Sequence, residues 1–124
     1  MSTIHDQICI SLPAQASYAR TFRMLAANLA TVLRMNVEEV EDVRMAAEEA
    51  FVLACESAAQ NIEATFVLFE QSVSMELMLG PEDISESQAF QYADLILQAV
   101  AKTYKLTDKS LYLEMSAGSI DEFK

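Results

Sequence analysis

The spacing of the apolar residues switches repeatedly between two periods along the chain, and this feature constrains the fold most. A period of two is typical of a strand with one buried face, and a period of about 3.6 is typical of an amphipathic helix. The pattern predicts, in chain order, a strand at 4–12, helices at 14–35 and 36–59, strands at 65–69 and 73–79, a helix at 87–105 and a strand at 111–115. The resulting order, β-α-α-β-β-α-β, predicts an α+β fold.

Residues between these segments support the predicted boundaries. Pro13 follows the first strand, and Asn36 precedes two acidic residues at the expected start of the second helix. Asparagine is a favoured N-cap, and acidic residues in the first turn stabilise the helix dipole. The polar run 70–72 separates two strand-like runs and therefore predicts an antiparallel hairpin, which Gly80 and Pro81 end.

The simplest way to bury the apolar faces of these elements is to pack them in two layers within a single domain, 1–124. We expect a two-layer sandwich in which the helices cover one face of a mixed four-stranded sheet. The opposite face would then carry Thr65, Val67 and Phe69 or their neighbours. Those side chains are too apolar to sit comfortably in water, which favours a homodimer or another protein contact on this face.

The charge and the N-terminal sequence exclude several classes of protein. The formal net charge of −11 argues against binding to nucleic acid or to an anionic membrane surface, because both ligands are negatively charged. The first twelve residues lack the basic region and apolar run of a signal peptide, and no segment approaches the ~18 apolar residues of a membrane span. A cytoplasmic protein is therefore expected.

The metal-ligating and phosphate-binding residue types are scarce. Cys9, Cys55 and the single His5 are too dispersed for a metal site, so the cysteines are expected to be free thiols in a reducing compartment. Gly80 and Gly118 are the only glycines, which excludes a glycine-rich phosphate loop of the usual kind. No metal and no cofactor is expected.

One segment resembles a known family. Residues 41–50, with the sequence EDVRMAAEEA, resemble the N-box helix of anti-sigma factor serine kinases, which belong to the GHKL (histidine-kinase-like) ATPase superfamily. Residues 15–20 resemble the start of that family's first helix, and the likeness covers about 12–58. It implies that Glu49 stands at the position of the general base. It also implies that Leu53 replaces the asparagine that ligates Mg²⁺, and an aliphatic side chain offers no oxygen to that cation.

The nucleotide-binding motifs of that family are also degenerate here. Its two-glycine D-x-G-x-G motif is expected after the strand ending near Leu79, where this chain has Gly80, Pro81, Glu82 and Asp83. The glycine-rich lid before the last helix has no counterpart, because residues 84–91 contain no glycine. Phosphoryl transfer needs a metal and positioned donors, so the resemblance implies a kinase-like protein that is not an enzyme.

The leading hypothesis is an anti-sigma-factor-like regulatory protein that acts by binding and sequestering a partner. The resemblance places Arg20 where family members contact a sigma factor or its antagonist, and Arg23 is the second candidate partner-binding residue. Two alternatives stay open: an ATP- and Mg²⁺-dependent serine kinase with an atypical nucleotide site that uses Glu49 as base, and an unrelated small α+β domain that binds an apolar ligand in a methionine-rich interior. Surface positions without a specific role are the simpler interpretation for both arginines and for the acidic face of Glu38, Asp42, Glu49 and Glu56.

Overall fold

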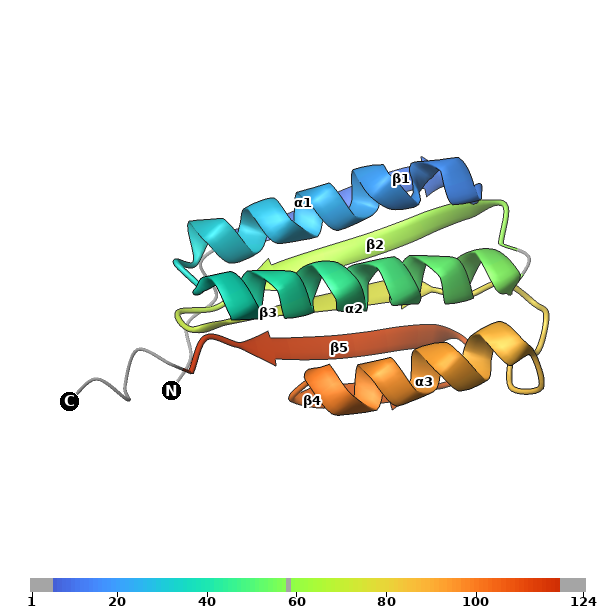
Figure 1. Ribbon diagram of the computed structural model, residues 1–124. Helices are drawn as coiled ribbons and strands as arrows, with labels where there is room; N and C mark the ends of the chain where they lie inside the picture. The colour runs from blue at the N-terminus through green and yellow to red at the C-terminus, as the bar shows by residue number, and fades with distance from the viewer. Residues whose placement is uncertain (1–5, 58, 119–124) are drawn as a thin grey trace.

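The computed structural model describes residues 6–57 and 59–118, and this part of the chain has an α+β fold. The elements, in chain order, are β1 (Asp6–Pro13), a 3-10 turn (Ala16–Tyr18), α1 (Ala19–Val32), α2 (Val37–Glu56), β2 (Asn61–Leu68), β3 (Ser72–Met78), α3 (Gln88–Val100), β4 (Thr103–Leu106) and β5 (Ser110–Ser116). The three helices lie side by side on one face of the sheet, with α2 between α1 and α3 (Figure 1). The predicted two layers are confirmed.

The sheet differs from the predicted one in size and in strand direction. It has five strands in the order β1-β2-β3-β5-β4, and every neighbouring pair is antiparallel. The mixed sheet that was expected would contain parallel neighbours, which need a crossover connection such as a helix. The strands joined by α3, β3 and β4, do run in the same direction, but β5 lies between them and pairs with both.

The missed strand is β4, which the sequence pattern had assigned to the third helix. The helix predicted at 87–105 ends at Val100, and Ala101 already has an extended backbone. Thr103 then pairs with Glu114, and Tyr104 pairs with Leu113. β-Branched and aromatic residues favour strands, and here the pairing with β5 outweighs the helical spacing of the apolar residues.

The predicted hairpin and the predicted start of α2 are confirmed. β2 and β3 pair antiparallel around the short turn 69–71, with β2 beginning at Asn61, earlier than expected. The Asn36 side chain accepts a hydrogen bond from the Glu39 backbone N–H, and the Glu39 carboxylate accepts one from the Asn36 N–H, both at 2.8 Å. This reciprocal capping box satisfies two N–H groups that a helix start leaves unpaired. The residues before Asp6 in the first predicted strand lie outside the described part of the chain.

Between α1 and α2 the chain turns through a residue with positive φ, Arg34 (φ 62°). The Met35 N–H donates to the Ala30 carbonyl at 3.1 Å, and the Arg34 N–H donates to the Thr31 carbonyl at 2.9 Å. This pair of bonds is a Schellman motif, which usually has glycine at the left-handed position. The turn brings α2 back alongside α1.

The core lies between the helices and the covered sheet face. α2 contributes mostly small side chains, so it approaches its neighbours closely; the fully buried ones are Ala46, Ala47, Ala50 and Ala54. Phe22 of α1 packs its ring against Phe51 of α2 and Phe66 of β2, with both pairs of ring centroids 5.3 Å apart. These aromatic contacts join the two layers.

The open sheet face is more polar than the sequence suggested. Thr65 and Val67 lie on it, half-buried, but Phe69 follows the end of β2. The neighbouring strands place polar residues beside Thr65 on this face. Glu76 of β3 pairs with Thr65 of β2, and Tyr112 of β5 pairs with Glu76. On the strands described here, the apolar face expected to favour a homodimer is therefore not present, and the homodimer stays a prediction without that support.

Candidate functional site

The two residues that the family resemblance singled out both lie on α2, one turn apart, but their environments differ. Leu53 is completely buried in the core. Glu49 lies at the rim of the buried face, half-exposed. At the position where the resemblance implies a metal ligand, the Leu53 side chain therefore fills space between the two layers.

Glu49 lies in an environment that disfavours its negative charge. Partial burial raises the pKa of its carboxyl group, and the neighbouring Glu48 raises it further. Within the described part of the chain no lysine or arginine forms an ion pair with Glu49. A carboxylate with a raised pKa can accept a proton, but here it lies beside a core leucine and has no metal-ligating neighbour one turn on.

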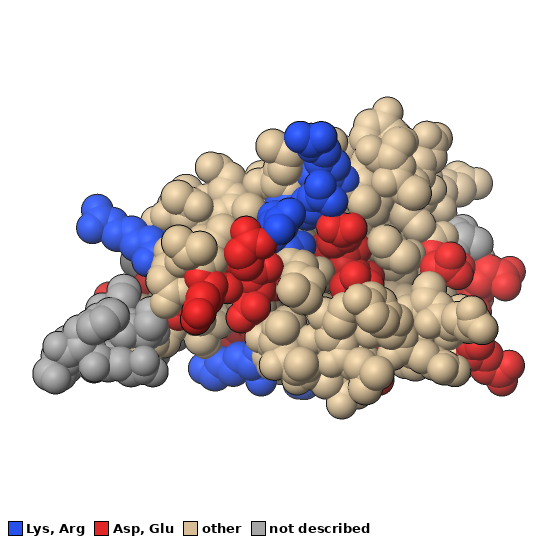
Figure 2. Space-filling view, viewed as in Figure 1, with Lys and Arg blue, Asp and Glu red and all other residues tan. Residues whose placement is uncertain are grey.

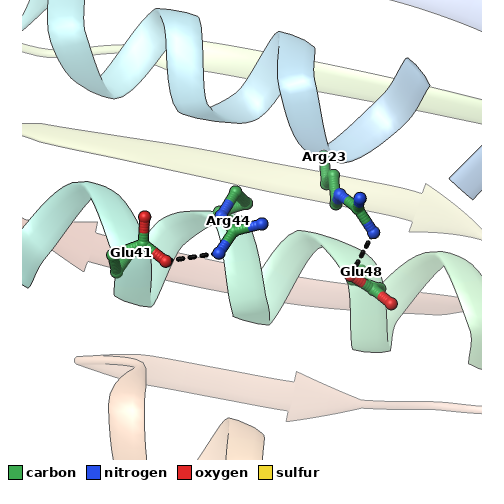
Figure 3. Close-up of polar contacts among 4 residues, drawn as sticks. All are labelled: Arg23, Glu41, Arg44 and Glu48. Carbon is green, nitrogen blue, oxygen red and sulfur yellow. Dashed lines mark hydrogen bonds and ion pairs between the residues drawn. The ribbon is translucent and has the colours of Figure 1, made fainter. Parts of the chain in front are cut away.

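The two arginines proposed as partner contacts behave differently. Arg23 of α1 reaches across to α2, where its Nη1 lies 2.9 Å from Glu48 Oε1 (Figure 3). Arg20 is exposed and forms no ion pair with any described residue. Arg23 is therefore held within the molecule, and Arg20 is the arginine of this pair that stays available to a partner.

Acidic side chains gather over α2 (Figure 2). Arg44 pairs with Glu41 on the same helix (Figure 3), and this contact raises the pKa of the arginine. Asp42 lies on the other flank of the helix, where burial raises its pKa and the nearby acids Glu38, Glu39 and Glu41 add to the effect. The surface of α2 is therefore acidic, with its two ion pairs on the side of α1.

The segment after β3, where the resemblance would place the two-glycine motif, is a loop that is hydrogen-bonded to the end of α2. Ser57, which is completely buried, accepts a hydrogen bond from the Gly80 N–H at 2.7 Å and donates one to the Ala54 carbonyl at 2.6 Å. The Ser57 carbonyl accepts a third bond from the Glu82 N–H at 3.0 Å. Ser57 was not predicted as a functional or structural residue, because a serine after a helix gives no signal of a distant partner.

This loop borders a surface hollow of about 400 Å³, formed by Leu79 and by residues 81–85 and 106–108. Three carboxylates line it: Glu82, Asp83 and Asp108. The Ser85 backbone and side chain donate to Asp83 and lower its pKa, so this group holds its negative charge strongly. A hollow lined in this way repels the phosphates of a nucleotide.

Two further hollows lie on the open sheet face and at the end of the sheet, with volumes of about 530 and 290 Å³. The larger one lies over β3, β4 and β5 and is lined by polar side chains, among them Glu76, Lys105 and Tyr112. Neither Glu49 nor Leu53 lines any of these three hollows.

The cysteines do not form a shared site. Cys9 is exposed on the open sheet face, whereas Cys55 is half-buried on α2, where burial and then Glu56 raise the pKa of its thiol. Residues 6–57 and 59–118 contain no group of three or more His, Cys, Asp or Glu side chains that is placed to hold a metal ion. His5 lies outside the described residues. Each helix described here is too short or too polar to cross a membrane.

No known family model matches the chain, and no curated protein matches it. The family resemblance therefore rests on the residues quoted above.

Proposed function

We propose that the protein is a non-catalytic, anti-sigma-factor-like regulator that binds and sequesters a sigma factor or its antagonist. The observation that carries this proposal is the environment of Leu53. At the position where the resemblance implies a metal ligand, this chain has a completely buried leucine. An Mg²⁺ ion needs oxygen ligands, and this position offers none.

The acidic hollow beside the Gly80–Asp83 loop supports the same proposal. In a GHKL-like kinase this segment would approach the nucleotide, whereas here it carries Glu82 and Asp83 and borders Asp108. The proposal therefore assigns no ATP and no Mg²⁺ to the protein, and its function depends on affinity and partner exchange.

Arg20 is the residue to which we assign the partner contact. It is exposed on α1 and unpaired among the described residues, whereas Arg23 is engaged by Glu48. Arginine is enriched among the residues that dominate binding energy at protein interfaces. We expect the Arg23–Glu48 pair to hold α1 in place and Arg20 to contact the partner.

The experiment has two arms. Isothermal titration of the protein with ATP and Mg²⁺ is expected to show no binding at millimolar nucleotide, and micromolar binding would overturn the non-catalytic proposal. In that event Glu49→Gln, assayed for phosphorylation of a candidate partner, tests the serine-kinase alternative.

The second arm measures the affinity of purified sigma factors and their antagonist proteins from the source cell by fluorescence anisotropy. We expect one of them to bind, and Arg20→Glu to weaken that binding at least about tenfold, a typical hot-spot effect. Arg34→Glu, an identical charge change at an exposed residue after α1, is the matched control and should bind normally. Failure of every candidate to bind, or equal effects of the two variants, would contradict the proposal.

A further inference from the structure

The outer surface of α3 is unusually apolar for an exposed helix in so acidic a chain. Asp94 is the only charged residue among its 13. Tyr92 and Leu95 expose 65% and 69% of their surface, and Ala99 is also exposed. These three residues follow one another at steps of three and four, so they form one stripe along the helix. In Figure 2 this region is the uncharged surface below the acidic patch.

The position of Asp94 shows which way this stripe faces. Tyr104 of β4 donates a hydrogen bond to the Asp94 carboxylate at 2.7 Å, so Asp94 marks the flank of α3 that faces the sheet edge. At roughly 100° per residue, Tyr92 and Ala99 lie on the opposite flank. That flank faces α2, against which α3 packs (Figure 1).

The facing flank of α2 carries unpaired acids. Glu48 binds Arg23 and therefore marks the flank that faces α1. Asp42 and Glu49 lie roughly 100° or more around the helix from Glu48, on the side of α3. Met45, 43% exposed, lies between them on the outer surface. Neither Asp42 nor Glu49 forms an ion pair with a described residue.

The two flanks together form a continuous surface with an acidic side and an apolar side. We call it the α2–α3 surface and define it as Asp42, Met45 and Glu49 of α2 with Tyr92, Leu95 and Ala99 of α3. Burial raises the pKa of both Asp42 and Glu49, and repulsion by neighbouring acids of α2 raises each of them further. A positively charged ligand would relieve this repulsion, whereas a second copy of the chain would add the same acids to it.

We propose that the α2–α3 surface binds a basic amphipathic helix of a partner protein. The apolar side of that helix packs against Tyr92, Leu95 and Met45, and its lysine or arginine residues pair with Asp42 and Glu49. An α3 of 13 residues is about 20 Å long, which matches three to four turns of a partner helix that uses anchors at i, i+3 or i+4 and i+7. This surface lies on the other side of α2 from Arg20 and Arg23, so the proposal does not depend on the function proposed above.

The test uses three fluorescent peptides of about 16 residues, a length that gives four to five helical turns. The first has leucines on one face and lysines on the other. The second carries glutamates in place of the lysines, and the third has the first peptide's composition in an order that is not amphipathic. We expect the first peptide to bind the full chain, with an affinity that falls as salt is raised, and the other two to bind at least about tenfold more weakly, or about 1.4 kcal/mol.

Variants locate the binding surface. Leu95→Gln and the pair Asp42→Asn with Glu49→Gln should each weaken the first peptide about tenfold. The controls are Met24→Gln, an apolar residue 55% exposed on α1, and Glu70→Gln, an exposed acid in the β2–β3 turn; both should bind normally, as should Arg20→Glu. Equal losses in the control variants, equal binding of all three peptides, or no binding of the first would overturn the proposal. So would a dimer in sedimentation velocity that Leu95→Gln dissociates.

Discussion

Arg23 on α1 and Glu48 on α2 form an ion pair, with Nη1 and Oε1 2.9 Å apart, between helices that are adjacent in sequence and in the sheet-covering layer. Their side chains are 28% and 40% exposed, so the pair lies at the edge of the helix interface. Because of this contact the two flanks of α2 differ in charge. On the flank toward α1 an arginine neutralises the Glu48 carboxylate, whereas on the flank toward α3 the acidic side chains form no ion pair with a described residue. Both proposed binding surfaces follow from this division.

Breaking the ion pair should cost stability without abolishing folding. We expect Arg23→Met to lower the free energy of unfolding by up to about 1 kcal/mol, because exposed or half-exposed pairs contribute little more than this. A double-mutant cycle with Glu48→Gln, measured by urea denaturation, should give a coupling energy above zero. Arg20→Met, a matched change on the same helix, should leave stability unchanged. A larger loss in Arg20→Met than in Arg23→Met would contradict the assignment of roles to the two arginines.

Arg34, in the turn after α1, has a strained backbone conformation that a glycine would adopt without strain. Arg34 has φ 62°, a left-handed conformation that costs a non-glycine residue roughly 1–2 kcal/mol. We expect Arg34→Gly to raise the free energy of unfolding by about 1 kcal/mol while the two Schellman hydrogen bonds are kept. Met24→Gly, inside α1, should lower it by about 1 kcal/mol. Equal destabilisation by both glycines in thermal denaturation would rule out strain at Arg34.

The type of an element was predictable where the apolar residues kept one spacing along the whole segment, or where a capping residue stood at its end. The hydrophobic spacing and Asn36 together gave the position of α2, and the capping box confirms that start. β4 could not be found in this way, because its four residues continue the apolar spacing of α3 and only the pairing with β5 makes them a strand. The strand order likewise depends on long-range pairing that local patterns do not carry.

For the candidate site, the sequence identified the residues but not their surroundings. It marked Glu49 and Leu53 on one helix, yet only the packing of α2 between its neighbours shows that Leu53 lies in the core. It gave Arg20 and Arg23 the same role, as candidate partner-binding residues. The salt bridge that separates their roles joins residues 25 positions apart, and no spacing rule predicts it.

Introducing the metal-ligating residue type at position 53 should damage the fold and give no Mg²⁺ site. Leu53→Asn places an amide in a completely buried apolar position, which we expect to lower the free energy of unfolding by about 3 kcal/mol. Leu95→Asn makes the same change at a residue 69% exposed and should stay within about 0.5 kcal/mol of the wild type. Urea denaturation with and without ATP and Mg²⁺ checks both. A stable Leu53→Asn protein that gains stability from the nucleotide would show that this position still borders a binding site.

Removing the Glu49 charge should stabilise the protein in a pH-dependent way. Because the pKa of Glu49 is raised in the folded protein above its ordinary value of 4.5, the folded state binds its proton more tightly than the unfolded state does. The contribution of this group to stability therefore falls as the pH rises from that ordinary value through the raised one, and it stays lower at neutral pH.

Glu49→Gln removes this effect, so at pH 7 we expect the free energy of unfolding to rise by a few tenths of a kcal/mol, a size set by the solvent exposure of the carboxyl group. The gain should shrink as the pH is lowered and vanish below about pH 4, where the carboxyl group is protonated in both states. Glu70→Gln in the exposed β2–β3 turn is the charge-matched control. Urea denaturation of the three proteins between acidic and neutral pH measures the difference. A gain that grew toward acidic pH would mean that a positive group stabilises the Glu49 carboxylate, which would also remove the basis for a basic ligand at the α2–α3 surface.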